Sequence, residues 1–181
     1  MIESERTQNL IIASAIIFGV ISAGIIVVNS NYYSGSYALA HYTEVSLENI
    51  RLTNLDPSNE SLIPGLYFTL NVQTRDDSAG DAALTYITVW PYLNGEAILY
   101  ATFTRQIPLE NQKLYPSYDQ NYTVSSSILD ESDQQILFDA YTSANWTWAV
   151  VVRYWYSVIS PDNLSFREIS FAYAGVSGID L

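Results

Sequence analysis

The hydrophobic pattern of the chain changes once, from an unbroken apolar run to strict alternation. Residues 10–28, LIIASAIIFGVISAGIIVV, contain no charged residue and no proline. A helix over this run is about 29 Å long, close to the hydrocarbon thickness of a bilayer. A lone strand would leave its backbone unpaired in lipid, and a buried helix of a soluble core normally keeps a polar stripe. Residues 10–28 are therefore predicted to be a transmembrane helix.

Charged residues on either side of this helix predict its orientation. Arg6 is the only Lys or Arg before the apolar run, and the next one is Arg51. The positive-inside rule then puts residues 1–9 in the cytoplasm and residues 44–181 outside it. The second segment also holds four glycosylation sequons, at Asn59, Asn121, Asn145 and Asn163, which agree with export.

A cleaved signal peptide is the alternative interpretation of the N-terminal segment. Ala38-Leu39-Ala40 matches an A-x-A cleavage site, but Ala40 lies twelve residues beyond Val28. The apolar run is also longer than a usual signal core, and no basic region precedes it. A retained anchor is expected. Residues 29–43 are then expected to be a tether near the lipid headgroups, because they hold Tyr32, Tyr33, Tyr37 and Tyr42.

Small residues recur every four positions within the apolar run, at Ala15, Gly19 and Ala23. Such a stripe lets a second helix approach closely, which predicts a helix-packing face. The alternative is that small residues are simply common in membrane helices.

From residue 44 onward, apolar and polar residues alternate with a period of two, as in half-buried strands. We expect strands at residues 44–54, 65–74, 82–92, 96–105, 118–128, 145–160 and 165–173. Asn94-Gly95 predicts a tight hairpin between two of them. In residues 82–92, Leu84, Tyr86, Thr88 and Trp90 are expected on one face. Residues 130–141 predict one helix, with Asp130 or Ser132 as its cap. The predicted fold is mainly β, an antiparallel sandwich.

The strand over residues 145–160 is unusually rich in aromatic residues. Its alternate positions, Trp146 to Tyr156, are expected to form core on one face, with a sugar- or partner-stacking platform as the less favoured interpretation. Because Tyr154, Trp155 and Tyr156 are consecutive, at least one large ring must point the other way. Trp155 is the predicted contact with a protein partner.

Composition excludes several classes of function. Nineteen acidic residues against seven basic ones give a net charge of −12, which argues against nucleic-acid binding. The chain has no cysteine, so disulfides and thiolate metal sites are excluded. His41 is the only histidine and lies in the expected tether, so we predict no catalytic site, no metal and no cofactor. Two acidic clusters offer oxygen ligands for Ca²⁺, but solvated turns are the favoured interpretation; the clusters are Asp76, Asp77 and Asp81, and Asp130, Glu131 and Asp133.

The order of features from Val45 onward resembles the late embryogenesis abundant group 2 superfamily, which includes the water-stress and hypersensitive-response domains. The stretches that carry the likeness are VSLENIRLTNL, PGLYFTLNVQT, ITVWPYLNGEAILYATFTRQIPLENQK, NYTVSSSIL and WTWAVVVRYWYSV. The resemblance implies an immunoglobulin- or fibronectin-III-like sandwich in a binding or structural module, as in archaeal single-span surface proteins. The sequence departs from the family at Thr74-Arg75-Asp76, where Asn-Pro is usual. Archaellum-stator proteins and archaeal pilins, which combine a helix with a sandwich, are a second and weaker likeness.

These features together predict a non-catalytic, single-pass cell-surface glycoprotein with a structural, adhesive or assembly role. The expected partners are the lipid bilayer and other membrane or surface proteins, including copies of the same chain. Two alternatives stay open: an accessory subunit of a membrane enzyme complex, such as a respiratory complex, and a lipid-binding module.

Overall fold

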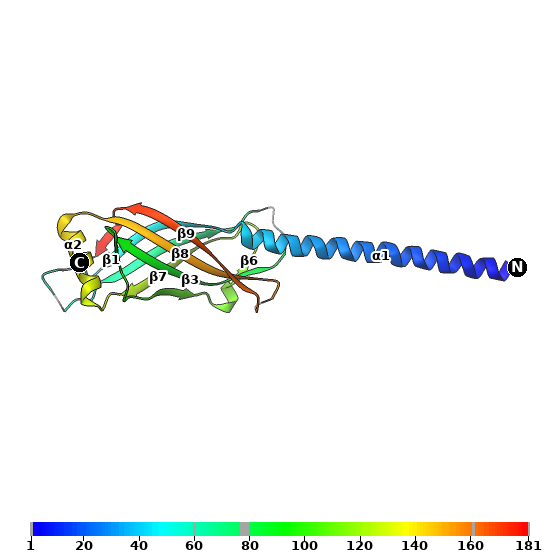
Figure 1. Cartoon of the computed structure of the whole chain (residues 1–181), viewed down its shortest axis with the longest axis horizontal. Coiled ribbons are helices and arrows are strands. Elements are labelled where there is room, and N and C mark those ends of the chain that lie inside the picture. The colour runs from blue at the N-terminus through cyan, green and yellow to red at the C-terminus, as the bar shows by residue number, and fades with distance from the viewer. Residues whose placement is uncertain (1, 60, 77–79, 161, 181) are drawn as a thin grey trace.

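The computed structural model describes residues 2–59, 61–76, 80–160 and 162–180, and it joins one long helix end-on to a β domain (Figure 1). The helices are α1 (Ile2–His41), α2 (Glu131–Ser143) and the short 3₁₀ helix η1 (Leu109–Asn111). The strands are β1 (Glu44–Thr53), β2 (Gly65–Gln73), β3 (Ala82–Leu93), β4 (Glu96–Ala97), β5 (Phe103–Gln106), β6 (Lys113–Leu114), β7 (Asp119–Ser127), β8 (Thr147–Val158), β9 (Leu164–Ala174) and β10 (Gly178–Asp180).

The strands form two sheets. One has the order β10-β1-β2-β7, and the other has the order β4-β3-β8-β9, with β5 and β6 also paired to β3. Neighbouring strands are antiparallel except for β1 and β10, which are parallel. The mainly β prediction is confirmed, and the two sheets face each other across one shared core, as in a β-sandwich.

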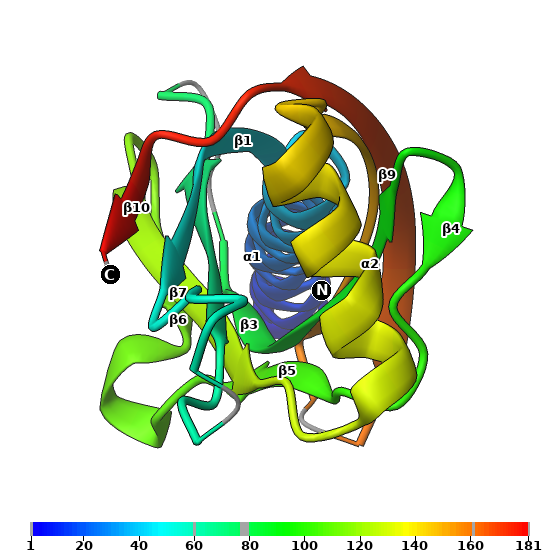
Figure 2. The same ribbon diagram turned by 90° about the vertical axis from the view of Figure 1, so that its left-hand side faces the viewer.

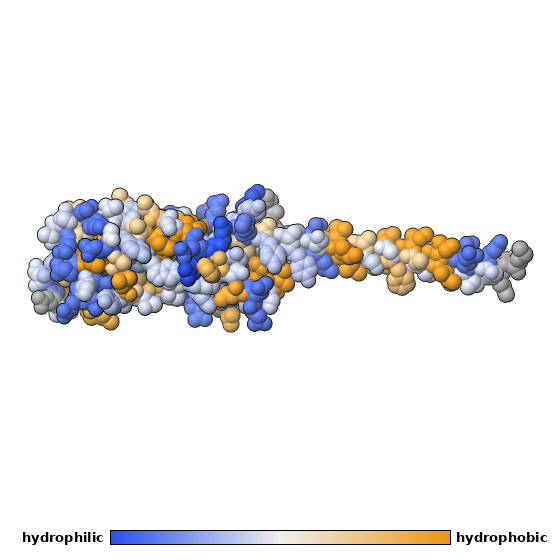
Figure 3. Space-filling view, in the orientation of Figure 1, coloured by the Kyte–Doolittle hydropathy of each residue, from blue (hydrophilic) through white to orange (hydrophobic). Residues whose placement is uncertain are grey.

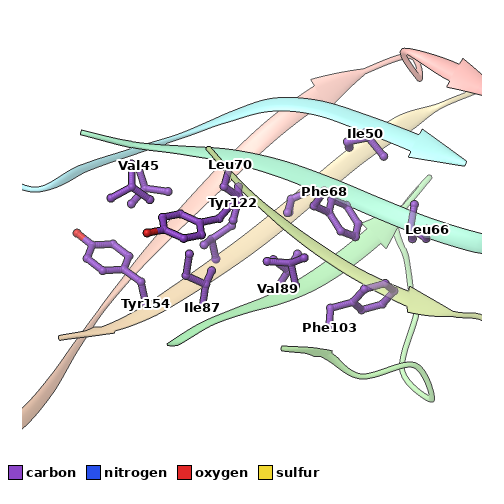
Figure 4. Packing of buried hydrophobic residues seen from close by; sticks show 14 of the residues in the cluster. Val45, Ile50, Leu66, Phe68, Leu70, Ile87, Val89, Phe103, Tyr122 and Tyr154 are labelled. Atoms are coloured by element: carbon purple, nitrogen blue, oxygen red, sulfur yellow. The ribbon is translucent and has the colours of Figure 1, made fainter. Parts of the chain in front are cut away.

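Aromatic side chains join the two sheets in the core. Phe68 of β2 meets Phe103 of β5 edge-on, with ring centroids 5.4 Å apart, and Trp148 of β8 at 6.1 Å (Figure 4 shows Phe68 and Phe103). Trp148, Val150, Val152 and Tyr154 are fully buried, so the predicted core face of β8 is confirmed. These rings pack together with a larger set of buried Leu, Ile and Val side chains from both sheets.

The Asn94-Gly95 hairpin lies where it was predicted, between β3 and β4. Asn94 and Gly95 both have positive φ, 52° and 90°, as a type I′ turn requires. The Asn94 side chain also donates to the carbonyl of Asn145 and accepts from the N–H of Thr147, at 2.9 and 3.1 Å. The turn is thereby attached to the start of β8.

The expectation of a single strand over residues 96–105 is wrong. It is divided into β4 and β5, and the backbone between them leaves the sheet. The N–H groups of Leu99 and Tyr100 donate instead to the two carboxylate oxygens of Asp133, at 3.1 and 2.9 Å. Asp133 is a buried residue of α2, so a helix side chain replaces the missing ladder partner.

The expectation that Leu84 and Trp90 share one face is also wrong. The pairing of β3 with β8 shifts register between Leu84 and Tyr86, which marks a β-bulge. The bulge places Leu84 with Ile87 and Val89 in the core, whereas Trp90 is exposed on the outer face. One extra residue is enough to reverse the faces because side chains alternate with period two.

α1 is longer than the apolar run that predicted it. Its described side chains are all exposed from Ser4 to Ser34, and the helix is long and apolar enough to cross a membrane (Figure 3 shows its apolar surface in orange). The predicted tether over residues 29–43 is wrong in conformation, because the helix continues to His41. Its last turns are buried at Ser36, Leu39 and Ala40, which pack into the end of the domain.

α2 is the helix predicted over residues 130–141. Asp130 is its N-cap and accepts from the N–H groups of Ser132 and Asp133, at 2.9 and 3.4 Å. Figure 2 shows α2 lying across the end of the two sheets that is opposite to α1. The two helices therefore cover opposite ends of the same core.

Candidate interaction surfaces

The junction between α1 and the domain is a close contact of helix backbone with the segment before β3. The hydroxyl of Ser36 donates to the Tyr32 carbonyl at 2.8 Å and accepts from the N–H of Asp81 at 2.9 Å. Gly80, with φ of +109°, lies so near that a Cβ on it would be 2.6 Å from the Ser36 nitrogen and 2.7 Å from the Tyr32 oxygen. Only glycine fits there, because both the space and the backbone conformation exclude a side chain.

The carboxylate of Asp81 adds a polar group to the same junction. It accepts from the hydroxyl of Tyr32 at 2.9 Å and pairs with the ammonium of Lys113 at 2.9 Å. The hydrogen bond from Lys113, and then the one from Tyr32, lowers the pKa of Asp81 below its usual value. This ion pair is exposed, so it orients the side chains more than it stabilises the fold.

Side chains of strands β8 and β9 form a second set of hydrogen bonds, with backbone carbonyls at and just beyond the C-terminal end of α1. The hydroxyl of Tyr154, on β8, donates to the carbonyl of Thr43 at 3.1 Å, and Arg167 on β9 donates to the carbonyl of His41. The Thr43 hydroxyl donates to the Leu39 carbonyl at 2.8 Å. Burial raises the pKa of Tyr154, which keeps its hydroxyl protonated as a donor. The helix and the domain are thus joined by hydrogen bonds from several elements.

The outer face of the second sheet holds a cluster that we call the aromatic patch: Tyr86, Trp90, Arg153, Trp155 and Phe166. Tyr86, Trp155 and Phe166 are cross-strand neighbours on β3, β8 and β9. Their ring centroids are 5.0 Å apart for Tyr86–Trp155 and 6.2 Å for Trp155–Phe166. Trp90 is 37% exposed and Phe166 is 54% exposed, so two large aromatic rings of the patch face solvent.

Arg153 is the centre of the aromatic patch. Its guanidinium carbon lies 4.6 Å from the Phe166 centroid, 4.8 Å from that of Trp90 and 5.6 Å from that of Trp155. Its Nη2 and Nε atoms both donate to one carboxylate oxygen of Glu168, at 2.8 and 3.2 Å. The charge is therefore fixed between the rings, and the patch combines apolar stacking surface with one oriented cation.

The predicted contact residue Trp155 lies on this outer face and is half-buried among its neighbours, whereas Tyr154 points into the core. Its role in partner binding stays a prediction. Reasoning from the sequence did not identify the other members of the patch, which are Tyr86, Trp90, Arg153 and Phe166. If the bulge in β3 had been known, aligning the alternating residues of β3 and β9 with those of β8 would have placed these side chains beside Trp155.

The other predicted site residues are scattered over the surface. The four sequon residues Asn59, Asn121, Asn145 and Asn163 are all exposed. Ala15, Gly19 and Ala23 lie on the exposed part of α1, and Gly19 has no neighbouring atom within 4 Å of its would-be Cβ. These positions are accessible to modification or to another helix, and both roles stay predictions.

The described carboxylates of the two acidic clusters have separate partners. Asp81 pairs with Lys113, Asp130 caps α2, and Asp133 accepts from backbone N–H groups. Asp77 lies outside the described residues. Within the part of the chain that the structure describes, no three His, Asp or Glu side chains are grouped to hold a metal ion.

Comparison with known proteins gives no family. No family model matches the chain, and no curated protein matches it. Among solved structures, a protein from Archaeoglobus fulgidus is 10% identical and has a TM-score of 0.45; the match covers 73% of this chain and 98% of that one. A β-glucosidase from Kluyveromyces marxianus is 10% identical with a TM-score of 0.31, and the match covers 75% of this chain and 15% of the enzyme. Neither likeness carries an argument about function.

Proposed function

We propose that this chain is a single-span membrane protein whose β domain has a structural, adhesive or assembly role at the cell surface. The observation that carries the proposal is the exposed apolar surface of α1 over residues 10–28. Exposing so many large aliphatic side chains to water is unfavourable, at about 25 cal/mol per Å² of apolar surface. A bilayer removes that surface from water along the whole run.

The proposed orientation has the N-terminus in the cytoplasm and the domain outside. Arg6 precedes the span, and no Lys or Arg follows it until Arg51. The exposure of all four sequon residues supports glycosylation of an exported domain, since a glycosyltransferase needs accessible asparagines. For the domain we propose an immunoglobulin- or fibronectin-III-like sandwich, which the family resemblance and the two facing sheets, antiparallel except for the β1–β10 pair, support.

The partner surface that we propose is the aromatic patch. Exposed tryptophan and arginine side chains are the types that contribute most to protein interfaces, and here the ion pair with Glu168 orients Arg153 before any partner arrives. The proposed partner is another membrane or surface protein, including a second copy of this chain.

Membrane fractionation and partner capture together test this function. The full chain should stay in the membrane pellet after alkaline carbonate extraction, and release into the supernatant would contradict the proposal. Partners crosslinked to the full chain should be lost from Trp155→Ser and Phe166→Ser variants. A Tyr100→Ser variant should retain them, because Tyr100 is exposed but lies outside the aromatic patch.

The identity of the captured partners separates the proposal from its rival. Copies of this chain or envelope proteins would support an assembly role. Redox or other catalytic membrane subunits would support the alternative role as an accessory subunit of a membrane enzyme.

A further inference from the structure

The end of the domain that receives α1 exposes two aliphatic side chains. Leu109, in η1, is 83% exposed, and Ile159, between β8 and β9, is 42% exposed. Both line a cavity of about 350 Å³ whose wall also contains Tyr32 of α1, Asp81 and Lys113. The two aliphatic side chains thus lie beside the helix where it enters the domain.

Ile159 has an unusual backbone conformation in addition to its exposed side chain. Its φ is +69°, in the left-handed region, which a β-branched residue seldom adopts. Glycine or asparagine would occupy this conformation with less strain, and an exposed position does not need an aliphatic side chain for packing. The turn itself therefore does not account for an exposed aliphatic side chain at this position.

The number of helix residues between the apolar run and the domain determines how far the α1 end of the domain is from the hydrocarbon layer. Tyr32 is four residues beyond Val28, which is about 6 Å along the helix axis. The headgroup region of one leaflet is about 5–7 Å thick. The hydroxyl of Tyr32 is bonded to Asp81, and Asp81 to Lys113, so these domain residues are tied to the helix at the headgroup level.

We propose that this end of the domain is a lipid-contact surface, in which Leu109 and Ile159 rest on the headgroup layer of the bilayer that α1 crosses. Tyr32 lies at the depth where tyrosine is enriched in membrane proteins. The Lys113 ammonium, paired with Asp81, adds a polar group at the same level. The inference rests on the proposed membrane span and adds that the domain is seated on the membrane and does not stand clear of it.

Site-specific fluorescence tests the contact directly, because a chain without cysteine accepts one labelled cysteine at a time. Leu109→Cys, Leu129→Cys and Val20→Cys are each labelled with a small environment-sensitive fluorophore and reconstituted as the full chain into phosphatidylcholine vesicles. Leu129 is a matched control, since it is 70% exposed and precedes α2 at the far end of the domain. Val20 lies within the apolar run and reports on the span itself.

A lipid carrying a shallow nitroxide should quench the label at position 109 strongly and the label at position 129 little. Equal, weak quenching at positions 109 and 129, with the label at position 20 quenched by a deep nitroxide, would overturn the lipid contact and leave the span intact. Loss of quenching at position 20 as well would overturn the span on which the contact depends.

Discussion

The hydroxyl of Ser36 accepts a hydrogen bond from the backbone N–H of Asp81 at 2.9 Å, and so joins α1 to the first residues before β3. The same hydroxyl donates to the Tyr32 carbonyl one helical turn earlier. Because Ser36 is fully buried, this contact fixes the direction in which the helix leaves the domain. The long helix and the β domain are therefore joined at a defined contact.

Substitution of Gly80 tests how close this contact is. Gly80→Ala should destabilise the domain by more than the usual cost of a left-handed alanine, about 1–2 kcal/mol, because its Cβ would also meet backbone atoms of α1. Gly175→Ala is the matched control: Gly175 also has a positive φ, but nothing lies within 4 Å of its Cβ position. Denaturant unfolding of both variants in detergent micelles measures the difference. Equal losses would mean that the close approach to Ser36 does not constrain Gly80.

Acid should weaken the polar part of the junction. The pKa of Asp81 is lowered in the folded chain by Lys113 and Tyr32, so its contribution to stability is present above the pKa of an unfolded aspartate, about 3.9. That contribution is lost as the pH falls through the lowered pKa of the folded state. The wild-type chain should therefore be more stable than Asp81→Asn at pH 6, and the gap should narrow toward pH 3. Thermal unfolding at both pH values checks this, and a gap that widens in acid would contradict it.

Asp133 should contribute far more to stability than an exposed aspartate of the same helix. Asp133→Ala leaves the N–H groups of Leu99 and Tyr100 without their acceptor, at a cost of about 1–3 kcal/mol for each group that stays buried. Asp139→Ala, at an exposed position in the same helix, should change the free energy of unfolding by about 0.5 kcal/mol or less. Similar losses for the two variants would show that the segment between β4 and β5 does not depend on α2.

Ile159→Gly should stabilise the domain by about 1 kcal/mol, because it removes the strain of a β-branched residue at positive φ. Ile159→Ala provides the comparison, since it deletes the same side-chain atoms beyond Cβ but keeps the strained backbone. The difference between the two variants in denaturant midpoint isolates the backbone contribution. If alanine and glycine are equally stable, the left-handed conformation at this position costs nothing.

The small-residue stripe on α1 predicts helix association. Gly19→Leu should reduce crosslinking between helices in the membrane, since a bulky side chain keeps a second backbone at a distance. Gly24→Leu makes the same substitution about 140° around the helix from Gly19 and should leave crosslinking unchanged. Undiminished crosslinking of the Gly19 variant would show that the stripe is not a packing face.

The sequence identified most elements because their signals are local. The alternation in Gly65–Gln73, the Asn94-Gly95 turn and the Asp130 cap each depend on residues close in the chain. The helix beyond Val28 was missed because tyrosine, serine and glycine are poor helix formers, and the burial of Leu39 and Ala40 outweighs that preference.

Features that depend on contacts between distant residues could not be predicted. The bulge in β3 reversed the face of Trp90, and the carboxylate of Asp133 took the place of a strand between β4 and β5. The aromatic patch therefore had only one predicted member, Trp155. Tyr86, Trp90 and Phe166 lie on neighbouring strands whose register a single sequence does not give, and Arg153, on β8 itself, is identified only by its contacts with those rings.

Labelling of single cysteines from one side of the membrane tests the central claim, that α1 crosses a bilayer and leaves the domain outside. In intact cells, a membrane-impermeant maleimide should label Ser143→Cys in α2 and should reach Ser4→Cys only after the membrane is permeabilised. Both positions are exposed in the folded chain, so accessibility depends only on the side of the membrane. Labelling of Ser4→Cys alone, or of both variants only after lysis, would contradict the account.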